Sequence, residues 1–216
     1  MKQMIQWTVA ILIAATVARA DVEHAHKAKA KCCVESATEG ETSAAALPDK
    51  SIYQTESKWT TDSGKSIHLS ALKGKPQVVV MFFASCEFAC PILVHDLKEI
   101  EAKLPENLRG KVGFTLVSFD SERDTAEALA SFRKRLELGA DWNLLRGESD
   151  DVLELTALLG VKFKKDVRGQ FAHSNVITVL NAGGEIVKQI NGLKQDPQLT
   201  IEALEKAIGP KTLAIQ

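Results

Sequence analysis

The sequence is poor in aromatic residues, close to neutral overall and without a long hydrophobic run. Aromatic side chains make up 6% of the 216 residues, and 27 Lys and Arg side chains stand against 28 Asp and Glu, a formal net charge of −1. A nucleic-acid-binding chain usually carries a basic excess, so this balance argues against a nucleic-acid partner. No apolar run reaches the ~20 residues that cross a bilayer, so no permanent membrane span is expected in the mature chain.

The first 20 residues have the pattern of a secretory signal peptide. Lys2 supplies a positive charge, Trp7 to Val17 is an apolar stretch of signal-peptide length, and Ala18-Arg19-Ala20 is a small-x-small cleavage site. We therefore expect cleavage before Asp21 and an exported protein of the periplasm or cell envelope. An uncleaved signal anchor is the alternative.

Residues 21–50 are predicted to form a flexible tail, and residues 51–216 a single folded domain. The tail is rich in Ala, Glu, Lys and Ser and has no sustained apolar period. It contains His24, His26, Cys32 and Cys33, a small His/Cys tract that would suit copper or zinc. The alternatives are an auxiliary metal site and an inert or intermolecularly oxidised tail.

The domain pattern predicts alternating strands and helices. A hairpin is expected at Trp59–Leu69, and the β-branched and aromatic run Gln77–Phe83 is typical of a central strand buried on both faces. The further expected elements are a helix at 91–103, a strand at 112–119, a helix at 124–138 opened by a capping box at Asp124–Glu127, a strand at 142–145, a helix at 150–159, a hairpin at 175–190 and a helix from 196. This order predicts an α/β fold: a thioredoxin-like central sheet flanked by helices, with an N-terminal β-hairpin extension.

Two cysteines follow the first buried strand, in Cys86-Glu-Phe-Ala-Cys90-Pro91. In a regular helix thiols at this spacing have Cβ atoms ~5–6 Å apart, too far for an unadjusted disulfide. A trigonal metal needs sulfur atoms only about 4 Å apart, and a helix N-terminus favours thiolate. The spacing therefore suits metal capture at least as well as dithiol redox chemistry, and a structural disulfide is the third alternative.

The sequence resembles the Sco/SenC family, copper-handling members of the thioredoxin superfamily. The resemblance rests on Cys86-x-x-x-Cys90-Pro91, on Ser118-Phe-Asp120-Ser-Glu-Arg-Asp124-Thr125 after the next strand, and on His173-Ser174 before the last hairpin. It implies a copper site made by Cys86, Cys90 and His173. It also implies that copper is delivered to the copper-site subunit of a respiratory oxidase, or that the thiols of that site are maintained.

The donor set is compatible with this implication. Soft thiolates select Cu(I), and a set of two cysteines and one histidine also tolerates Cu(II). The segment Phe171–Val176 has no proline where thioredoxin-type oxidoreductases place one beside the thiols, which favours metal binding. Glu87 and Ser121 stand where the family usually has proline. These departures bear on the partner and the affinity.

Several polar residues allow two interpretations. Asp120 either orients His173 or caps its loop, and Asp124 is expected to cap a helix. The charged segment Lys162–Asp166 is either a solvated loop or part of a docking surface. His68 and His95 are expected on the surface, the latter on a charged helix face with Asp96, Lys98 and Glu99.

Three functions remain open from sequence. The first is an exported copper metallochaperone that passes copper to an oxidase subunit or to another copper chaperone. The second is an enzyme, a thiol-disulfide oxidoreductase that uses Cys86 and Cys90 as its catalytic redox pair. The third is a copper-sensing or copper-buffering envelope protein in which the tail matters as much as the domain.

Overall fold

The computed structural model of the chain describes residues 48–167 and 169–208. The predicted signal peptide and the tail residues His24, His26, Cys32 and Cys33 lie outside these residues. Within the described ranges, no helix combines the length and the apolar character needed to cross a membrane.

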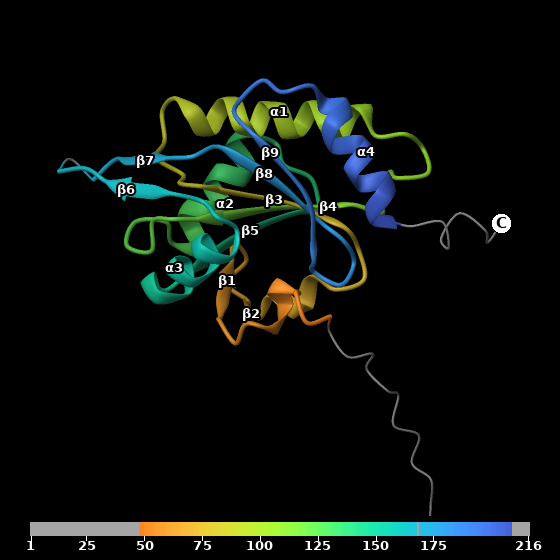
Figure 1. The fold of residues 1–216 in the computed structure, drawn as a ribbon. Helices are drawn as coiled ribbons and strands as arrows, with labels where there is room; N and C mark the ends of the chain where they lie inside the picture. The colour runs from red at the N-terminus through yellow and green to blue at the C-terminus, as the bar shows by residue number, and fades with distance from the viewer. Residues whose placement is uncertain (1–47, 168, 209–216) are drawn as a thin grey trace, which may run out of the picture. The chain divides into compact units, whose positions relative to one another are not determined.

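A seven-stranded mixed sheet forms the centre of the fold (Figure 1). Its order is β2-β1-β5-β4-β3-β8-β9, with β3, β4 and β5 parallel and the remaining neighbours antiparallel. The strands are β1 (Trp59–Thr61), β2 (Ser66–Ile67), β3 (Gln77–Phe82), β4 (Gly113–Ser118), β5 (Trp142–Gly147), β8 (Val176–Leu180) and β9 (Ile186–Asn191). The hairpin β1–β2 joins the sheet through β5, which confirms the N-terminal extension. Every residue of β3, β4 and β8 is buried, as the apolar run of β3 predicted.

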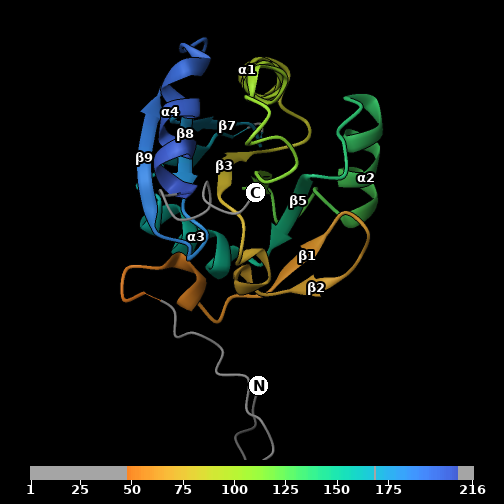
Figure 2. The same cartoon turned by 90° about the vertical axis from the view of Figure 1, so that its right-hand side faces the viewer.

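Helices cover both faces of this sheet. Two crossovers that step the same way across parallel strands place their helices on one face, and α1 (Ala89–Lys103) and α2 (Ala126–Arg135) follow this rule. The C-terminal helix α4 (Pro197–Ile208) packs beside α1, whereas α3 (Ser149–Leu158) lies on the opposite face (Figure 2). Short 3₁₀ turns at Ile52–Gln54 and Leu69–Leu72 flank the first hairpin. The α/β class and the thioredoxin-like arrangement predicted from sequence are confirmed.

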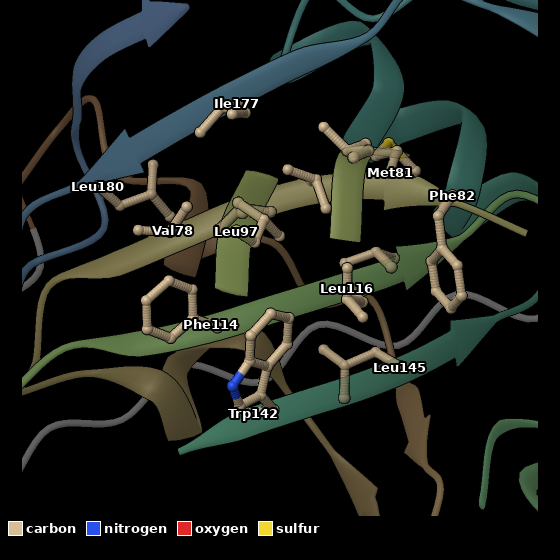
Figure 3. Close-up of a cluster of buried hydrophobic side chains, with 14 of the residues drawn as sticks. Val78, Met81, Phe82, Leu97, Phe114, Leu116, Trp142, Leu145, Ile177 and Leu180 are labelled. Atoms are coloured by element: carbon tan, nitrogen blue, oxygen red, sulfur yellow. The ribbon is translucent and has the colours of Figure 1, made fainter. Parts of the chain in front are cut away.

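The core beneath α1 and α2 is made of large side chains from the central strands (Figure 3). Phe114 and Trp142 stack with ring centroids 4.9 Å apart, and the Trp142 indole N–H donates to Glu101 of α1. Phe82 meets Phe132 of α2 at 4.9 Å. These contacts pack the parallel strands against α1 and α2, and the Phe82–Phe132 contact does so at the carboxyl-terminal edge of the sheet.

A second, two-stranded sheet projects from that edge. Its strands are β6 (Phe163–Lys165) and β7 (Phe171–His173), paired antiparallel with Phe163 opposite His173. Figure 1 shows both strands extending from the end of the sheet where the chain enters α1. The interpretation of Lys162–Asp166 as a solvated loop was wrong in one respect: its charged residues are exposed, but the segment contains a strand whose Phe163 stacks on buried Phe119.

Helix α2 differs from the prediction at both ends. Thr125, and not Asp124, caps α2: its hydroxyl accepts from the Ala128 amide at 3.2 Å. The helix then ends at Arg135, three residues short of the predicted end at Leu138.

At α1, Asp96 is buried and not on a charged face, because its carboxylate accepts from the Lys194 amide at 2.7 Å.

Candidate metal centre

The loop between β3 and α1 positions the two thiols. Helix α1 begins at Ala89, two residues earlier than predicted, so Cys90 lies in its first turn and Cys86 precedes it. The Cys86 amide donates to the Phe83 carbonyl, and the Cys90 amide donates to Cys86 Sγ at 3.3 Å. Cys86 therefore contacts Cys90 from the loop before the helix, at the helix N-terminus, and the two residues are not neighbours on one helical turn. Neither is in a disulfide.

His173, the last residue of β7, completes the group. Its Nε2 lies 3.8 Å from Cys90 Sγ, and its Nδ1 contacts the Ser174 carbonyl at 3.2 Å. An N–H at Nδ1 would leave the Nε2 lone pair free to bind a metal. Ser174 is in turn fixed to Lys162, from its amide at 2.9 Å and through its hydroxyl at 3.0 Å. Lys162, which directly precedes β6, thus holds the residue whose carbonyl contacts the imidazole.

The ligand atoms of Cys86, Cys90 and His173 all lie within 4.8 Å of one another. With metal–sulfur bonds near 2.3 Å and metal–nitrogen bonds near 2.0 Å, a trigonal site needs a sulfur–nitrogen separation of about 3.7 Å. The observed 3.8 Å between Cys90 Sγ and His173 Nε2 fits this value. Within residues 48–167 and 169–208, no other group of three or more His, Cys, Asp or Glu side chains brings its ligand atoms together in this way.

The pKa values of the two thiols are shifted in opposite directions. A hydrogen bond from Cys90 and the amides at the start of α1 lower the pKa of Cys86 to about 5. The same hydrogen bond, together with burial, raises the pKa of Cys90 well above its usual value. Half-buried Cys86 is therefore the thiolate of the metal-free protein, and fully buried Cys90 keeps its proton until a metal or a disulfide replaces it.

This difference predicts selective alkylation. In the reduced, metal-free protein, Cys86 should react with iodoacetamide much faster than Cys90 at pH 7. Its rate should fall as the pH is lowered through about 5, where the thiolate takes up its proton. Peptide-resolved mass spectrometry separates both from Cys32 and Cys33. Equal rates at Cys86 and Cys90, or a midpoint near 8.5, the value of a free thiol, would contradict it.

Two carboxylates near the site support the backbone and do not touch His173. Asp120 accepts from the backbone and side-chain N–H groups of Arg123, so of its two interpretations loop capping is confirmed. Buried Asp124 accepts from the Ala84 amide at 2.9 Å and from the Ser118 hydroxyl at 2.5 Å. Burial raises the pKa of Asp124. The Asp124 carboxylate thus links the residue after β3, at the start of the cysteine loop, to the last residue of β4.

A groove of about 630 Å³ gives access to the site. Cys86 and His173 line it together with the largely apolar side chains of Phe83, Phe88 and Phe171. Phe88 is 80% exposed at its rim. A larger hollow of about 820 Å³ between α1 and the start of α4 contains His95 but none of the three candidate ligands. His68 and His95 are exposed, as predicted.

Comparison with known families decides what kind of domain carries this site. The family model described as SCO1/SenC matches residues 46–209. The chain belongs to the SCO1/SenC family. The resemblance inferred from Cys86, Cys90 and His173 is thereby confirmed.

Solved structures share the fold of this SCO1/SenC protein. A putative electron transfer protein from Aquifex aeolicus VF5 superposes with a TM-score of 0.67 at 25% identity, covering 74% of this chain and 94% of that one. Copper-bound ScoI from Arabidopsis thaliana gives 0.63 at 23%, covering 70% and 94%. Copper-bound yeast Sco1 gives 0.60 at 18%, covering 74% and 92%.

A curated protein matches a shorter part of the chain than the solved structures do. A putative copper-binding protein from Stutzerimonas stutzeri is 23% identical over 119 residues, which cover 53% of this chain. The match spans 57% of that relative's own length.

The surroundings of His173 were missed from sequence. The ring lies against Phe119, with centroids 5.1 Å apart, and edge-on to Phe83 at 6.2 Å. Phe119 also stacks on Phe163 at 4.9 Å and on Phe171 at 6.1 Å. We call Phe83, Phe119, Phe163 and Phe171 the aromatic cluster; it uses half of the eight phenylalanines of the chain. The signal of a hairpin that the sequence offered was one phenylalanine on each side of Asp166–Gly169, namely Phe163 and Phe171.

Proposed function

We propose that this protein is an exported metallochaperone that binds one copper ion through Cys86, Cys90 and His173 and delivers it to the copper centre of a respiratory oxidase. The observation that carries the proposal is the convergence of the three ligand atoms within 4.8 Å at a helix N-terminus, with the cysteines unbridged. Family membership and the copper-bound relatives support it. The predicted signal peptide at residues 1–20, the tail at 21–50 and the domain at 51–216 belong to the same proposal.

The geometry supports release by exchange of ligands. Cys90 is fully buried, whereas Cys86 and His173 are half-buried and face the groove. A donor from an acceptor protein would enter through the groove and replace Cys86 or His173 first, with Cys90 leaving last. Copper changes hands without a change of oxidation state, and each thiolate set free takes up a proton or keeps its charge according to its pKa. The two sulfurs favour Cu(I), and the imidazole extends the site to Cu(II).

The test is copper retention in His173→Ala. We expect the reduced protein to bind Cu(I) stoichiometrically with or without His173, because two thiolates remain. Cu(II) should leave the variant at least about tenfold faster, since loss of a ligand exceeds the loss of an outer partner. Transfer of Cu(II) to a chelator, followed by absorption, measures the rate. Unchanged Cu(II) retention would remove His173 from the proposed site.

A second function, thiol-disulfide exchange, is favoured by the low pKa of Cys86. The Cys86 thiolate would attack a partner disulfide and form a mixed disulfide. Cys90, on losing its proton, would then attack Cys86 Sγ, leaving an oxidised pair here and a reduced dithiol on the partner. Reduction of insulin disulfides by the metal-free protein at thioredoxin-like rates would support this function over copper delivery.

A further inference from the structure

The hairpin that carries His173 is hydrogen-bonded to the loop between β4 and α2. Arg123, in that loop, donates from Nη2 to the carbonyl oxygen of Gly169 at the hairpin turn. Its guanidinium carbon also lies over the Phe171 ring, 6.0 Å from the centroid. One side chain therefore contacts the hairpin both at its tip and on β7.

Arg123 is itself held by a buried carboxylate. Asp120 is 1% exposed and accepts from Arg123 twice, from the side-chain Nε–H and from the backbone amide at 3.2 Å. Hydrogen bonds between charged partners are about twice as strong as neutral ones. The planar fork of arginine presents donors to Asp120 and Gly169 in one fixed geometry, which an ammonium on a flexible stem does not provide. The guanidinium thus joins the carboxyl-terminal edge of the main sheet to the hairpin.

A parallel link is weaker. Lys165 Nζ lies 2.6 Å from a Glu122 oxygen and 5.7 Å from the Phe171 centroid. The two cationic side chains are equally open to water, Lys165 at 38% and Arg123 at 39% exposed, but Glu122 is 75% exposed whereas Asp120 is 1% exposed. Ion pairs this open to water contribute 0 to about 1 kcal/mol in general. Arg123 is therefore the main polar link between loop and hairpin.

The position of His173 depends on such links. It follows Phe171 by two residues in a strand of three, and an isolated two-stranded hairpin is marginally stable in water. The aromatic cluster supplies the apolar part of the attachment. The hydrogen bond to Gly169 adds a directional contact at the hairpin turn, four residues before His173, whose Nε2 lies 3.8 Å from Cys90 Sγ.

We propose that Arg123 is a positioning residue for the metal centre: by holding Gly169 and Phe171 against buried Asp120, it keeps the His173 imidazole within bonding reach of a metal on Cys86 and Cys90. This inference rests on the proposed copper site. Its consequence is selective, because Cu(II) depends on the imidazole whereas Cu(I) is held by two thiolates alone. Arg123 therefore sets which oxidation state the protein retains.

The experiment compares Arg123→Gln with wild type in the full-length protein. We expect Cu(II) to pass to a chelator about tenfold faster from the variant, the lower end of the 10–100-fold cost for partners that orient a ligand. The thiolate-to-Cu(II) absorption should shift, while the Cu(I) affinity from competition should stay within about twofold. Arg123→Lys keeps the charge but not the fork, so its release rate should lie between the two.

A matched control is Arg133→Gln. Arg133 also pairs with an aspartate, Asp62, and donates to the Gly139 and Trp142 carbonyls at 2.7 and 2.8 Å. It fastens the turn of the β1–β2 hairpin instead. If Arg123 has only a structural role, both Arg123→Gln and Arg133→Gln would lower the thermal stability and leave the copper spectrum unchanged. Lower stability with an unchanged copper spectrum in Arg123→Gln would overturn the inference. If Arg123→Gln does not fold, Cu(II) release from Arg123→Lys at the wild-type rate would overturn it.

His173→Ala, measured in parallel, separates the two proposals. If it leaves Cu(II) release unchanged, the ligand set itself is wrong, and the positioning role is lost with it. If His173→Ala accelerates release and Arg123→Gln does not, the copper site stands and Arg123 has no part in it. Faster release from both, with Arg133→Gln at the wild-type rate, is the expected outcome.

Discussion

Replacing Cys86 with serine is expected to lower copper affinity by more than about 100-fold, beyond the range for loss of an outer partner. Cys86 supplies the thiolate that exists before metal arrives, because its pKa is lowered to about 5. A serine hydroxyl stays protonated at neutral pH and is a hard donor that Cu(I) does not favour. The measurement is competition with a Cu(I) chelator, together with loss of the thiolate-to-Cu(II) absorption.

The tail cysteines and a neighbouring serine provide the controls. Cys32 and Cys33 bring thiols of their own, so the comparison is made with both replaced by serine in the parent protein and in the variant. Ser85→Ala changes an exposed side chain next to Cys86 and should leave the affinity unchanged. Copper binding by Cys86→Ser as tight as in the parent would exclude Cys86 as a ligand.

Phe119→Ala is expected to reduce the free energy of unfolding by about 3–5 kcal/mol and to accelerate Cu(II) release as well. Phe119 is 3% exposed and contacts Phe163, Phe171 and the His173 ring. Its removal leaves a cavity beneath the hairpin, so the hairpin and His173 lose their apolar support. Urea unfolding and chelator transfer measure the two effects.

Phe114→Ala separates packing from metal binding. Phe114 lies in β4, the strand that Phe119 follows, at the end away from the cysteines; it is 1% exposed and stacks on Trp142. It should lose a comparable free energy of unfolding while keeping wild-type Cu(II) release. Equal release from both variants would show that the aromatic cluster does not support His173.

The fold could be predicted because its central strands carry their own signal. Val78–Phe82 is apolar throughout because both faces of β3 are covered, and the alternation with amphipathic helices follows from parallel strand order. The ligands could be predicted for a related reason. Cys86 and Cys90 stand at a strand-to-helix junction, and the resemblance to a family supplied His173.

The support of the site could not be predicted, because it depends on contacts between distant segments. Strands β6 and β7 have three residues each, too few for a clear period. Arg123 and Gly169 are 46 residues apart in sequence and meet only in the folded chain. Asp120 was left between two interpretations, of which the loop cap is confirmed, and Asp124 was expected to cap a helix, which it does not. Asp124 instead satisfies the Ala84 amide at the end of a neighbouring strand, and Thr125 takes its place as the helix cap.

The central claim, that one copper ion binds the two sulfurs and the imidazole together, is tested most directly by pulsed electron paramagnetic resonance. The sample is the full-length protein with one equivalent of Cu(II). The account predicts coupling to a single histidine nitrogen, which is lost in His173→Ala and retained when His24 and His26 are both replaced by alanine. Coupling that persists in His173→Ala would contradict the account.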